Sequence, residues 1–167
     1  MHGIPISIKD QIHQKGKFSS VGFAHLMQEV QTEDSPIVES YLKAGAIPLV
    51  RGNVAMGAMS IHTKNLVFGE SLNPYNTSRS CGGSSGGDAG LVAARCAPLG
   101  LGIDIGGSVR IPAAFTGVYG FKPSQGRVSS RGVSASRKNI YSENSDLHSL
   151  CGPIGISVDD CVLGFKV

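Results

Sequence analysis

The sequence predicts an α/β protein, in which helices cover a central β-sheet. Short apolar runs that read as strands are separated by segments with helix start and stop signals; the runs cover residues 3–9, 46–50, 98–105 and 118–121. The two most apolar runs lack a strict polar–apolar alternation, which is typical of strands buried on both faces. With 167 residues, 41% of them hydrophobic and 16% charged, the chain can form one domain with a real core.

The first expected strand ends on a charged residue. In residues 3–9, Gly-Ile-Pro-Ile-Ser-Ile-Lys, the three isoleucines share one face because side chains alternate along a strand. Lys9 falls at the end of this strand, on the opposite face. Residues 10–33 are rich in glycine and serine, and loop or short irregular structure is expected there.

A first helix is expected to begin at Pro36. The preceding Asp34 and Ser35 are capping residues, proline is favoured at the first helical position, and Gly45 is a common helix end. One face of this helix is apolar, with Ile37, Val38, Tyr41 and Leu42. The following residues 46–50 are expected to form a short buried strand.

The next segment gives weaker signals. Asn53 can cap a second short helix that runs from Val54 to about Met59. Residues 60–80 have turn chemistry that centres on Asn73-Pro74-Tyr75-Asn76.

A helix and a strand are then expected in succession. Ser84 or Ser85 can cap a helix that reaches about Cys96, with Asp88 in its first turn, where the helix dipole favours an anion. A glycine-spaced strand follows over residues 98–105.

The last third of the chain alternates turns with short elements. A sharp turn at 106–108 leads into a short helix over 108–115, and the strand at 118–121 follows. The polar residues 124–146 include seven serines and are expected to form a loop. Ser157, with Asp159 and Asp160 behind it, opens a final helix.

Composition excludes several classes of function. The net charge is only +3, there is no Trp, and no basic stripe is interleaved with aromatics, so no nucleic-acid site is expected. The five histidines and four cysteines show no metal-ligand spacing, so no zinc site is expected. No apolar run reaches the roughly 18 residues that a transmembrane helix needs, and the first residues lack the pattern of a signal peptide.

The cysteines bear on the compartment. Cys96 lies in an apolar helical run and is expected to be a buried thiol. This cysteine usage fits a reducing compartment, with a disulfide left open. The sequence does not separate a cytoplasmic protein from a membrane-associated one.

The most informative stretch runs from Gly82 to Arg110. It places Ser84 and Ser108 in glycine-rich turns on either side of one expected helix. Turns of small residues expose backbone N–H groups and let a hydroxyl approach a substrate closely. A serine nucleophile also needs a base, and Lys9 is an unusual candidate. The pattern indicates a Ser-Ser-Lys site for acyl transfer.

Three other interpretations of these turns are weaker. Residues 82–86 match G-x-S-x-G, the turn that holds the nucleophile of α/β-hydrolases, but residues 71–81 before it are turn-like rather than a strand. Residues 100–106 are one residue too long for the dinucleotide-binding pattern G-x-G-x-x-G. A flexible linker would explain residues 82–87 alone, but not a second glycine–serine turn one helix length later.

Four segments together resemble the amidase signature family. They are Gly-Ile-Pro-Ile-Ser-Ile-Lys-Asp at 3–10, Gly-Gly-Ser-Ser-Gly-Gly at 82–87, Gly-Ile-Asp-Ile-Gly-Gly-Ser-Val-Arg at 102–110 and Gly-Phe-Lys-Pro-Ser at 120–124. Their order and spacing agree with the family over nearly the whole chain. The resemblance implies a mixed β-sheet flanked by helices. It also implies that residues 1–167 are a partial domain, the N-terminal catalytic part of a longer fold.

The resemblance implies a role for each residue of the site. Ser108 is the nucleophile, Ser84 is a bridging serine on a cis peptide bond, and Lys9 is the base. The oxyanion hole consists of backbone N–H groups, those of Ile105, Gly106, Gly107 and Ser108.

Other positions refine the resemblance. Asn-Leu-Val-Phe-Gly at 65–69 and the Asp-Ile pair at 104–105 are similar to fatty acid amide hydrolases rather than to the catalytic chain of the glutamyl-tRNA amidotransferases. Asp104 and Arg110 flank the nucleophile and read as scaffold. Cys81 stands where proline is common in the family, which would loosen the turn before Ser84.

The predicted reaction is hydrolysis of a carboxylic amide, with fatty acid amides among the candidates, through an acyl-enzyme and without a cofactor or metal. The expected partner is a small-molecule amide, with lipid-derived amides included, and a homo-oligomer remains open. Two alternatives stay open as well. One is an amidotransferase-like subunit that works with a partner protein; the other is a non-catalytic fragment of an amidase.

The chemistry makes one demand of Lys9. A lysine has a reference pKa of about 10.4, so only about one molecule in a thousand is neutral near pH 7. A base must be neutral, and lowering that pKa to near 7 takes roughly 4 kcal/mol from burial and surrounding donors. The hypothesis therefore requires that Lys9 is buried.

Overall fold

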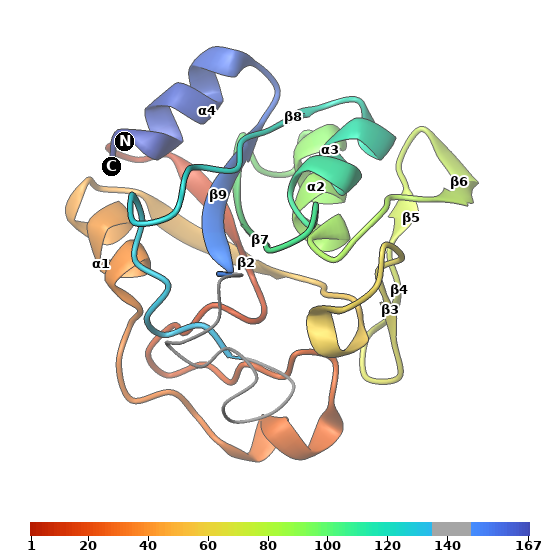
Figure 1. The fold of residues 1–167 in the computed structure, drawn as a ribbon, viewed down its shortest axis with the longest axis horizontal. Helices are drawn as coiled ribbons and strands as arrows, with labels where there is room; N and C mark the ends of the chain where they lie inside the picture. The colour runs from red at the N-terminus through yellow and green to blue at the C-terminus, as the bar shows by residue number, and fades with distance from the viewer. Residues whose placement is uncertain (135–147) are drawn as a thin grey trace.

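The computed structural model describes residues 1–134 and 148–167 and is built on a five-stranded sheet in the order β2-β1-β7-β9-β8 (Figure 1). The strands are β1 (Pro5–Lys9), β2 (Ile47–Gly52), β7 (Leu99–Asp104), β8 (Tyr119–Gly120) and β9 (Leu150–Gly155). β1 pairs in parallel with β2 and β7, whereas β9 pairs antiparallel with β7 and β8. The predicted α/β class with a mixed sheet is confirmed.

Helices cover both faces of the sheet. In Figure 1, α2 (Gly86–Ala93) and α3 (Arg110–Thr116) lie on one side, and α1 (Pro36–Lys43) and α4 (Val158–Phe165) lie on the other. The larger core lies on the α1 side and contains Ile6, Ile8, Ile12, Val38, Tyr41, Ala46, Leu99, Leu101, Ile103 and Cys151. A smaller core lies under α2 and α3, with Ala89, Val92, Val109 and Ile154.

The alternation along β1 decides which residues reach the site. Ile6 and Ile8 are fully buried in the larger core, so Ser7 and Lys9 point to the opposite face, toward α2. Burial of each isoleucine contributes about 2 kcal/mol to holding the strand in this register. The predicted face for the isoleucines and the opposite face for Lys9 are both confirmed.

The first and last helices begin as predicted. The Ser35 hydroxyl accepts from the N–H of Val38, 3.4 Å away, at the start of α1. At the start of α4, Ser157 and Asp160 form a reciprocal capping box, which satisfies two N–H groups that would lack a partner. The Tyr41 hydroxyl then donates to the carbonyl oxygen of Gly164 at 2.7 Å and joins α1 to α4.

Two strands of the sheet, β2 and β9, differ from the prediction. Residues 46–50 were expected to be buried, but Ile47 and Leu49 are 52% and 59% exposed because β2 is an edge strand with a neighbour on one side only. β9 was not expected at all. Its sequence, Leu-Cys-Gly-Pro-Ile-Gly, contains glycine and proline, which disfavour strands, yet the antiparallel pairing with β7 and the burial of every residue stabilise it.

The turn-rich residues 60–80 form two short hairpins rather than turns alone. They are β3 (Lys64–Asn65) with β4 (Gly69–Glu70), and β5 (Leu72–Asn73) with β6 (Asn76–Ser80). The predicted turn chemistry is nevertheless used, because the Asn73 side chain accepts from the N–H of Tyr75 at 3.0 Å.

Two helix predictions were wrong in detail, one for the segment after Asn53 and one for the cap of α2. The segment after Asn53 forms only a 3₁₀ turn, η2 (Met56–Ala58), and the Asn53 side chain bonds to Val54 and Asn65 instead of capping it. A second 3₁₀ turn, η1 (Ala24–Gln28), lies in the expected irregular segment. No side chain caps α2, because the Ser85 hydroxyl bonds to the backbone of Ile103.

Helix α2 also ends at Ala93, earlier than predicted. Cys96 therefore lies beyond the helix and is exposed, which corrects the expected buried thiol. Part of the expected loop at 124–146 lies outside the described residues.

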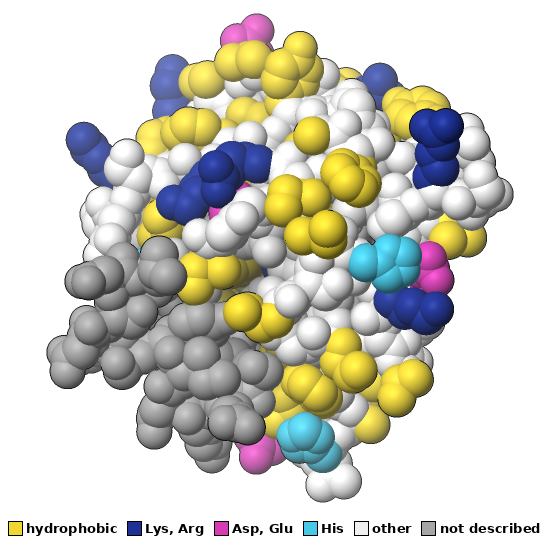
Figure 2. All heavy atoms as spheres, turned by 45° about the vertical axis from the view of Figure 1, so that its right-hand side comes forward, with side chains coloured by type: hydrophobic (Ala, Val, Ile, Leu, Met, Phe, Trp, Pro, Cys, Tyr) yellow, Lys and Arg dark blue, Asp and Glu magenta, His cyan; other side chains and the backbone are white. Residues whose placement is uncertain are grey.

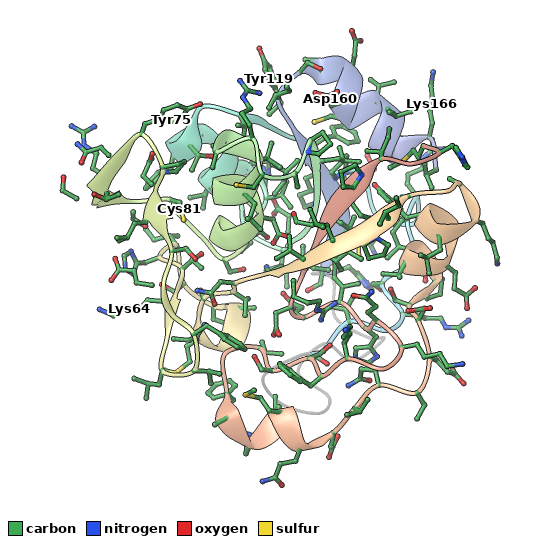
Figure 3. The ribbon with its side chains drawn as sticks, turned by 180° about the vertical axis from the view of Figure 1, so that it is seen from behind. Lys64, Tyr75, Cys81, Tyr119, Asp160 and Lys166 are labelled. Atoms are coloured by element: carbon green, nitrogen blue, oxygen red, sulfur yellow. The ribbon has the colours of Figure 1, made fainter. Side chains whose placement is uncertain are left out.

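Apolar side chains gather on the surface over α4 (Figure 2). Between α4 and β8 they border a groove of about 460 Å³ with Tyr119, Phe121, Val158, Val162 and Phe165 in its wall. Figure 3 shows Tyr119 beside the start of α4, near Asp160, and Lys166 at the far end. Within the described residues, no helix is both long and apolar enough to cross a membrane.

Candidate active site

Lys9 is buried, as its predicted role as a base requires. The side chain is fully buried, and its Nζ donates to the hydroxyl oxygen of Ser84 at 2.7 Å and to the carbonyl oxygen of Ile103 at 3.5 Å. The first contact joins the end of β1 to the glycine-rich turn before α2. The second joins it to β7, the strand that leads to Ser108.

The surroundings of Lys9 change its protonation. Burial lowers the pKa of Lys9 from 10.5 to about 7, against the opposing pull of nearby acidic groups, of which Asp88 has the largest effect and Asp104 the next. The neutral form of Lys9 is therefore populated near neutral pH, and a neutral amine can accept a proton.

The turn that carries Ser84 is fixed by backbone contacts. The Gly83–Ser84 peptide bond is cis, as the resemblance implied. The Thr63 hydroxyl donates to the carbonyl oxygen of Gly82 at 2.8 Å and accepts from the N–H of Gly86 at 3.0 Å, so one side chain holds both ends of the turn. Ser84 itself is 1% exposed.

Cys81, at the entrance to this turn, is packed rather than loose. It is fully buried, and its Sγ donates to the carbonyl oxygens of Ser71 at 3.0 Å and Gly86 at 3.1 Å. Burial raises the pKa of Cys81 to about 11, so the thiol stays protonated near neutral pH. Figure 3 shows the residue between the β5–β6 hairpin and α2.

Ser108 shares a cavity with Ser84. The cavity is small, about 10 Å³, and its wall includes both serines, Ile103 and Ile105. The N–H of Ser85 donates to the carbonyl oxygen of Ser108 at 3.1 Å, which ties the two glycine-rich turns together. Among the described residues, no hydrogen bond joins the Ser84 and Ser108 hydroxyls.

Asp104 organises the loop that presents Ser108. Its buried carboxylate accepts from the N–H groups of Gly107, Val109 and Arg110 at 2.6 to 3.3 Å, and from two guanidinium nitrogens of Arg110 at 2.9 and 3.1 Å. Burial alone would raise the pKa of Asp104, but these donors lower it overall, so the group is ionised at neutral pH. The structure thus places Asp104 and Arg110 as the scaffold of the loop.

The four N–H groups expected in the oxyanion hole do not have the same surroundings. The N–H of Gly107 already donates to Asp104. Those of Ile105, Gly106 and Ser108 donate to no protein acceptor in the described part of the chain. These three groups are therefore the ones free to bind an oxyanion.

Gly107 has a conformation that other residues rarely adopt, with a φ of +128°. A Cβ at this position would also lie 2.6 Å from the Cδ1 of Ile111, whereas a Cβ on the neighbouring Gly106 would meet no atom within 4 Å. Gly107 is thus the residue that lets the loop turn back toward Asp104.

We expect Gly107→Ala to lower kcat for amide hydrolysis about 100-fold with little change in KM, because a shifted loop misplaces the nucleophile and oxyanion donors. Gly90→Ala, on α2 and outside the loop, is the control and should change kcat less than about threefold, since its φ is ordinary and an added Cβ would lie 4.0 Å from the nearest atom, Cys81 Sγ. Steady-state kinetics of both variants measure the difference. Equal losses in the two variants would show that the backbone conformation at Gly107 is not what holds the site.

Sequence reasoning missed several residues in the cavity wall. Gln11, Ala58 and Ser149 line it together with the serines. Gln11 is 1% exposed, its Nε2 donates to the carbonyl oxygen of Ser134 at 2.9 Å, and its Oε1 has no hydrogen-bond partner among the described residues. No pattern in the sequence marks these positions, since only contacts between residues that are distant along the chain bring them to the cavity.

Among the described residues, no group of three His, Cys, Asp or Glu side chains could hold a metal ion. The arrangement instead offers a serine hydroxyl beside a second serine, a buried amine with a pKa of about 7, and free backbone N–H groups. Such a set can remove a proton from a hydroxyl and stabilise a negatively charged oxygen.

Known proteins are similar to this chain in sequence and in fold. The chain is 40% identical over 160 residues to an acetamidase of Aspergillus oryzae, covering 96% of this chain and 29% of that protein. It is 41% identical over 165 residues to a glutamyl-tRNA(Gln) amidotransferase subunit of Protochlamydia amoebophila, covering 99% and 32%. A solved structure of a fatty acid amide hydrolase superposes with a TM-score of 0.91 at 33% identity, covering 99% of this chain and 28% of that one.

The chain spans about three tenths of the length of these relatives. The family model described as amidase matches residues 1–167, and the segments that carry Lys9, Ser84 and Ser108 all fall within that match. The chain belongs to the amidase family.

Proposed function

We propose that the protein hydrolyses a carboxylic amide through an acyl-enzyme, with Ser108 as nucleophile, Ser84 as proton relay and Lys9 as base. The 2.7 Å contact between the buried Lys9 amine and the Ser84 hydroxyl carries the proposal, because it gives a neutral lysine a direct proton path to the cavity that Ser108 lines.

The proposed first step forms the acyl-enzyme. Ser108 Oγ attacks the amide carbonyl carbon while its proton passes to Ser84, whose own proton passes to Lys9. The carbonyl oxygen becomes an oxyanion and accepts from the N–H groups of Ile105, Gly106 and Ser108, which have no other acceptor among the described residues. The lysine then returns a proton through Ser84 to the leaving nitrogen, and the C–N bond breaks.

The second step releases the acid. A water molecule gives its proton along the same path to Lys9 and attacks the acyl carbon, and the Ser108 oxygen leaves with a proton returned by Lys9. The path is used in both directions, which requires a base with a pKa near the working pH. The pKa of about 7 for Lys9 fits that requirement.

A lipid-derived amide is the proposed substrate class. The support is the match to a solved fatty acid amide hydrolase and the apolar residues Ala58 and Ile105 in the cavity wall. Residues 1–167 are proposed to be part of a longer domain, since the apolar groove beside α4 is exposed and the relatives are about three times as long.

A fluorophosphonate probe tests the proposal on the full-length protein, because such probes phosphonylate an activated serine with loss of fluoride. The expected adduct is on Ser108 by peptide mass spectrometry, and its rate of formation should fall at least 100-fold in Lys9→Met. An adduct on Ser84 or Ser85 instead would favour the G-x-S-x-G interpretation. A folded full-length protein without any adduct would count against an assembled hydrolase.

An amidotransferase-like subunit is the second candidate, favoured by the 41% identity to the glutamyl-tRNA(Gln) amidotransferase protein of Protochlamydia amoebophila. Such a protein would deliver ammonia to a partner's reaction rather than release it. Purification with and without a stable companion protein, followed by measurement of free ammonia from glutamine, separates the two candidates. Strong hydrolysis of fatty acid amides by the protein alone supports the first.

A further inference from the structure

Asp88 is a buried carboxyl group that the proposed mechanism does not use. It lies in the first turn of α2, is fully buried, and neither of its oxygens has a hydrogen-bond partner among the described residues. An isolated buried carboxylate is costly, so such a group either stays protonated or shares its charge with a nearby cation.

The glycines around Asp88 locate it on the sheet. Gly52 is the β2 residue that pairs with Lys9, and a Cβ on Gly52 would lie only 2.2 Å from Asp88 Oδ1. The carboxyl group therefore rests directly on the backbone next to Lys9. A larger residue at position 52 would displace it.

The other side of Asp88 meets β7. Gly100 pairs with Ser7, and a Cβ on Gly100 would lie 2.9 Å from Ser7 Oγ and 3.2 Å from Asp88 Cβ. Asp88 thus spans from β2 to β7 across β1, on the face to which Ser7 and Lys9 point. Ser7 Oγ, like the Asp88 oxygens, is buried without a partner in the described part of the chain.

We propose that Asp88 is a positioning residue that acts through Lys9: the carboxyl group and the amine form one buried acid–base pair, and this pair sets the pH at which Lys9 can accept a proton. The proposal rests on the proposed function, in which Lys9 is the base. When Ser108 is acylated and Lys9 takes up a proton, an ionised Asp88 becomes the counter-ion of the new ammonium group.

The pKa values of the pair support this arrangement. Burial raises the pKa of Asp88 from 3.8 to about 7, and the neighbouring Ser7 hydroxyl and then the charge of Lys9 oppose that rise. Reciprocally, Asp88 raises the pKa of Lys9 more than any other acidic group does. The other titratable groups that face the pair are Asp10 after β1, Arg51 of β2, Cys81 before α2, Asp104 of β7 and Cys151 of β9, and a variant at Asp88 leaves all of them in place.

The pH dependence of kcat/KM tests the proposal on the full-length protein, between about pH 5 and pH 9. In Asp88→Asn the carboxylate that raises the pKa of Lys9 is gone, so the acidic limb of the profile should shift to lower pH by about one unit. Asp159→Asn, an exposed position at the start of α4, is the control and should not shift the limb. A folded Asp88→Asn with an unshifted limb would overturn the proposal.

Infrared spectroscopy gives a second test that needs neither activity nor a folded Asp88→Asn. Protonated carboxyl groups have a distinct C=O band, and ordinary carboxyl groups lose it as the pH rises past about 5. The wild-type protein should keep one such band to about pH 7. In Lys9→Met the band should persist to higher pH, because the cation that lowers the pKa of Asp88 is absent.

The outcomes separate the two proposals. No persistent band in the wild-type protein, or the same titration in Lys9→Met, would overturn the acid–base pair even if the enzyme is active. The expected bands in a protein that hydrolyses no amide would support the pair and count against the proposed function.

Discussion

Ser108→Ala should abolish amide hydrolysis, with kcat reduced on the order of 10⁶-fold in the full-length protein. The physical reason is that the variant has no oxygen to form the acyl bond, while the oxyanion donors and the Lys9–Ser84 contact remain. The remaining rate would come from binding and oxyanion stabilisation alone. Steady-state kinetics and the loss of the fluorophosphonate adduct measure the effect.

The control for this prediction is Ser130→Ala, an exposed serine outside the site, which should keep wild-type kinetics. The N–H of Ser85 bonds to the backbone carbonyl of residue 108, so replacement of the hydroxyl should leave the two turns joined and the melting temperature nearly unchanged. A Ser108→Ala protein that hydrolyses amides within tenfold of the wild-type rate would show that another group is the nucleophile.

Lys9→Met should lower kcat about 10⁴-fold, because no other group contacts Ser84 as a base among the described residues. Methionine has a similar length and suits a buried site, so the loss should reflect the missing amine more than a cavity. Lys64→Met, at an exposed lysine of the β3–β4 hairpin, is the control and should keep full activity.

The pH dependence of kcat/KM tests the same role of Lys9. The pKa of Lys9 is lowered to about 7, and only the neutral amine accepts a proton, so kcat/KM should rise with pH and level off above about pH 7. Below that value it should fall about tenfold per pH unit. The residual activity of Lys9→Met should lack this limb. Retention of the limb in the variant would assign it to another group.

Much of the site could be predicted from the sequence because its residues lie in short segments with strong local chemistry. Glycines in the turns around Ser84 and Ser108 allow backbone conformations that other residues rarely adopt, such as the positive φ of Gly82 and Gly107. The isoleucines of β1 fix which way Lys9 points. The family resemblance then related three segments that are far apart along the chain. The assignment of roles to these residues stays a prediction that the variants above test.

The failures have a common physical cause. β9 reads as a poor strand, and β2 reads as a buried one, because the burial of a strand depends on its place in the sheet, which local patterns do not encode. Likewise the Ser85 hydroxyl would cap α2 in isolation, but Ile103 of β7 offers it a stronger tertiary partner. Asp88 reads as an ordinary first-turn anion until the sheet beneath it is known.

The pairing of β1 has a consequence for how the protein is synthesised. Lys9 is synthesised well before its partners, because its contacts on Ser84 and Ile103 lie 75 and 94 residues later in the chain. At 5–20 residues per second, the ribosome needs about 5–20 s to produce them. During that time the lysine is solvated and cationic, and Ile6 and Ile8 lack their core partners on β7. The proposed base thus acquires its reactivity only late in synthesis, and a nascent chain that stops before β7 carries an ordinary lysine.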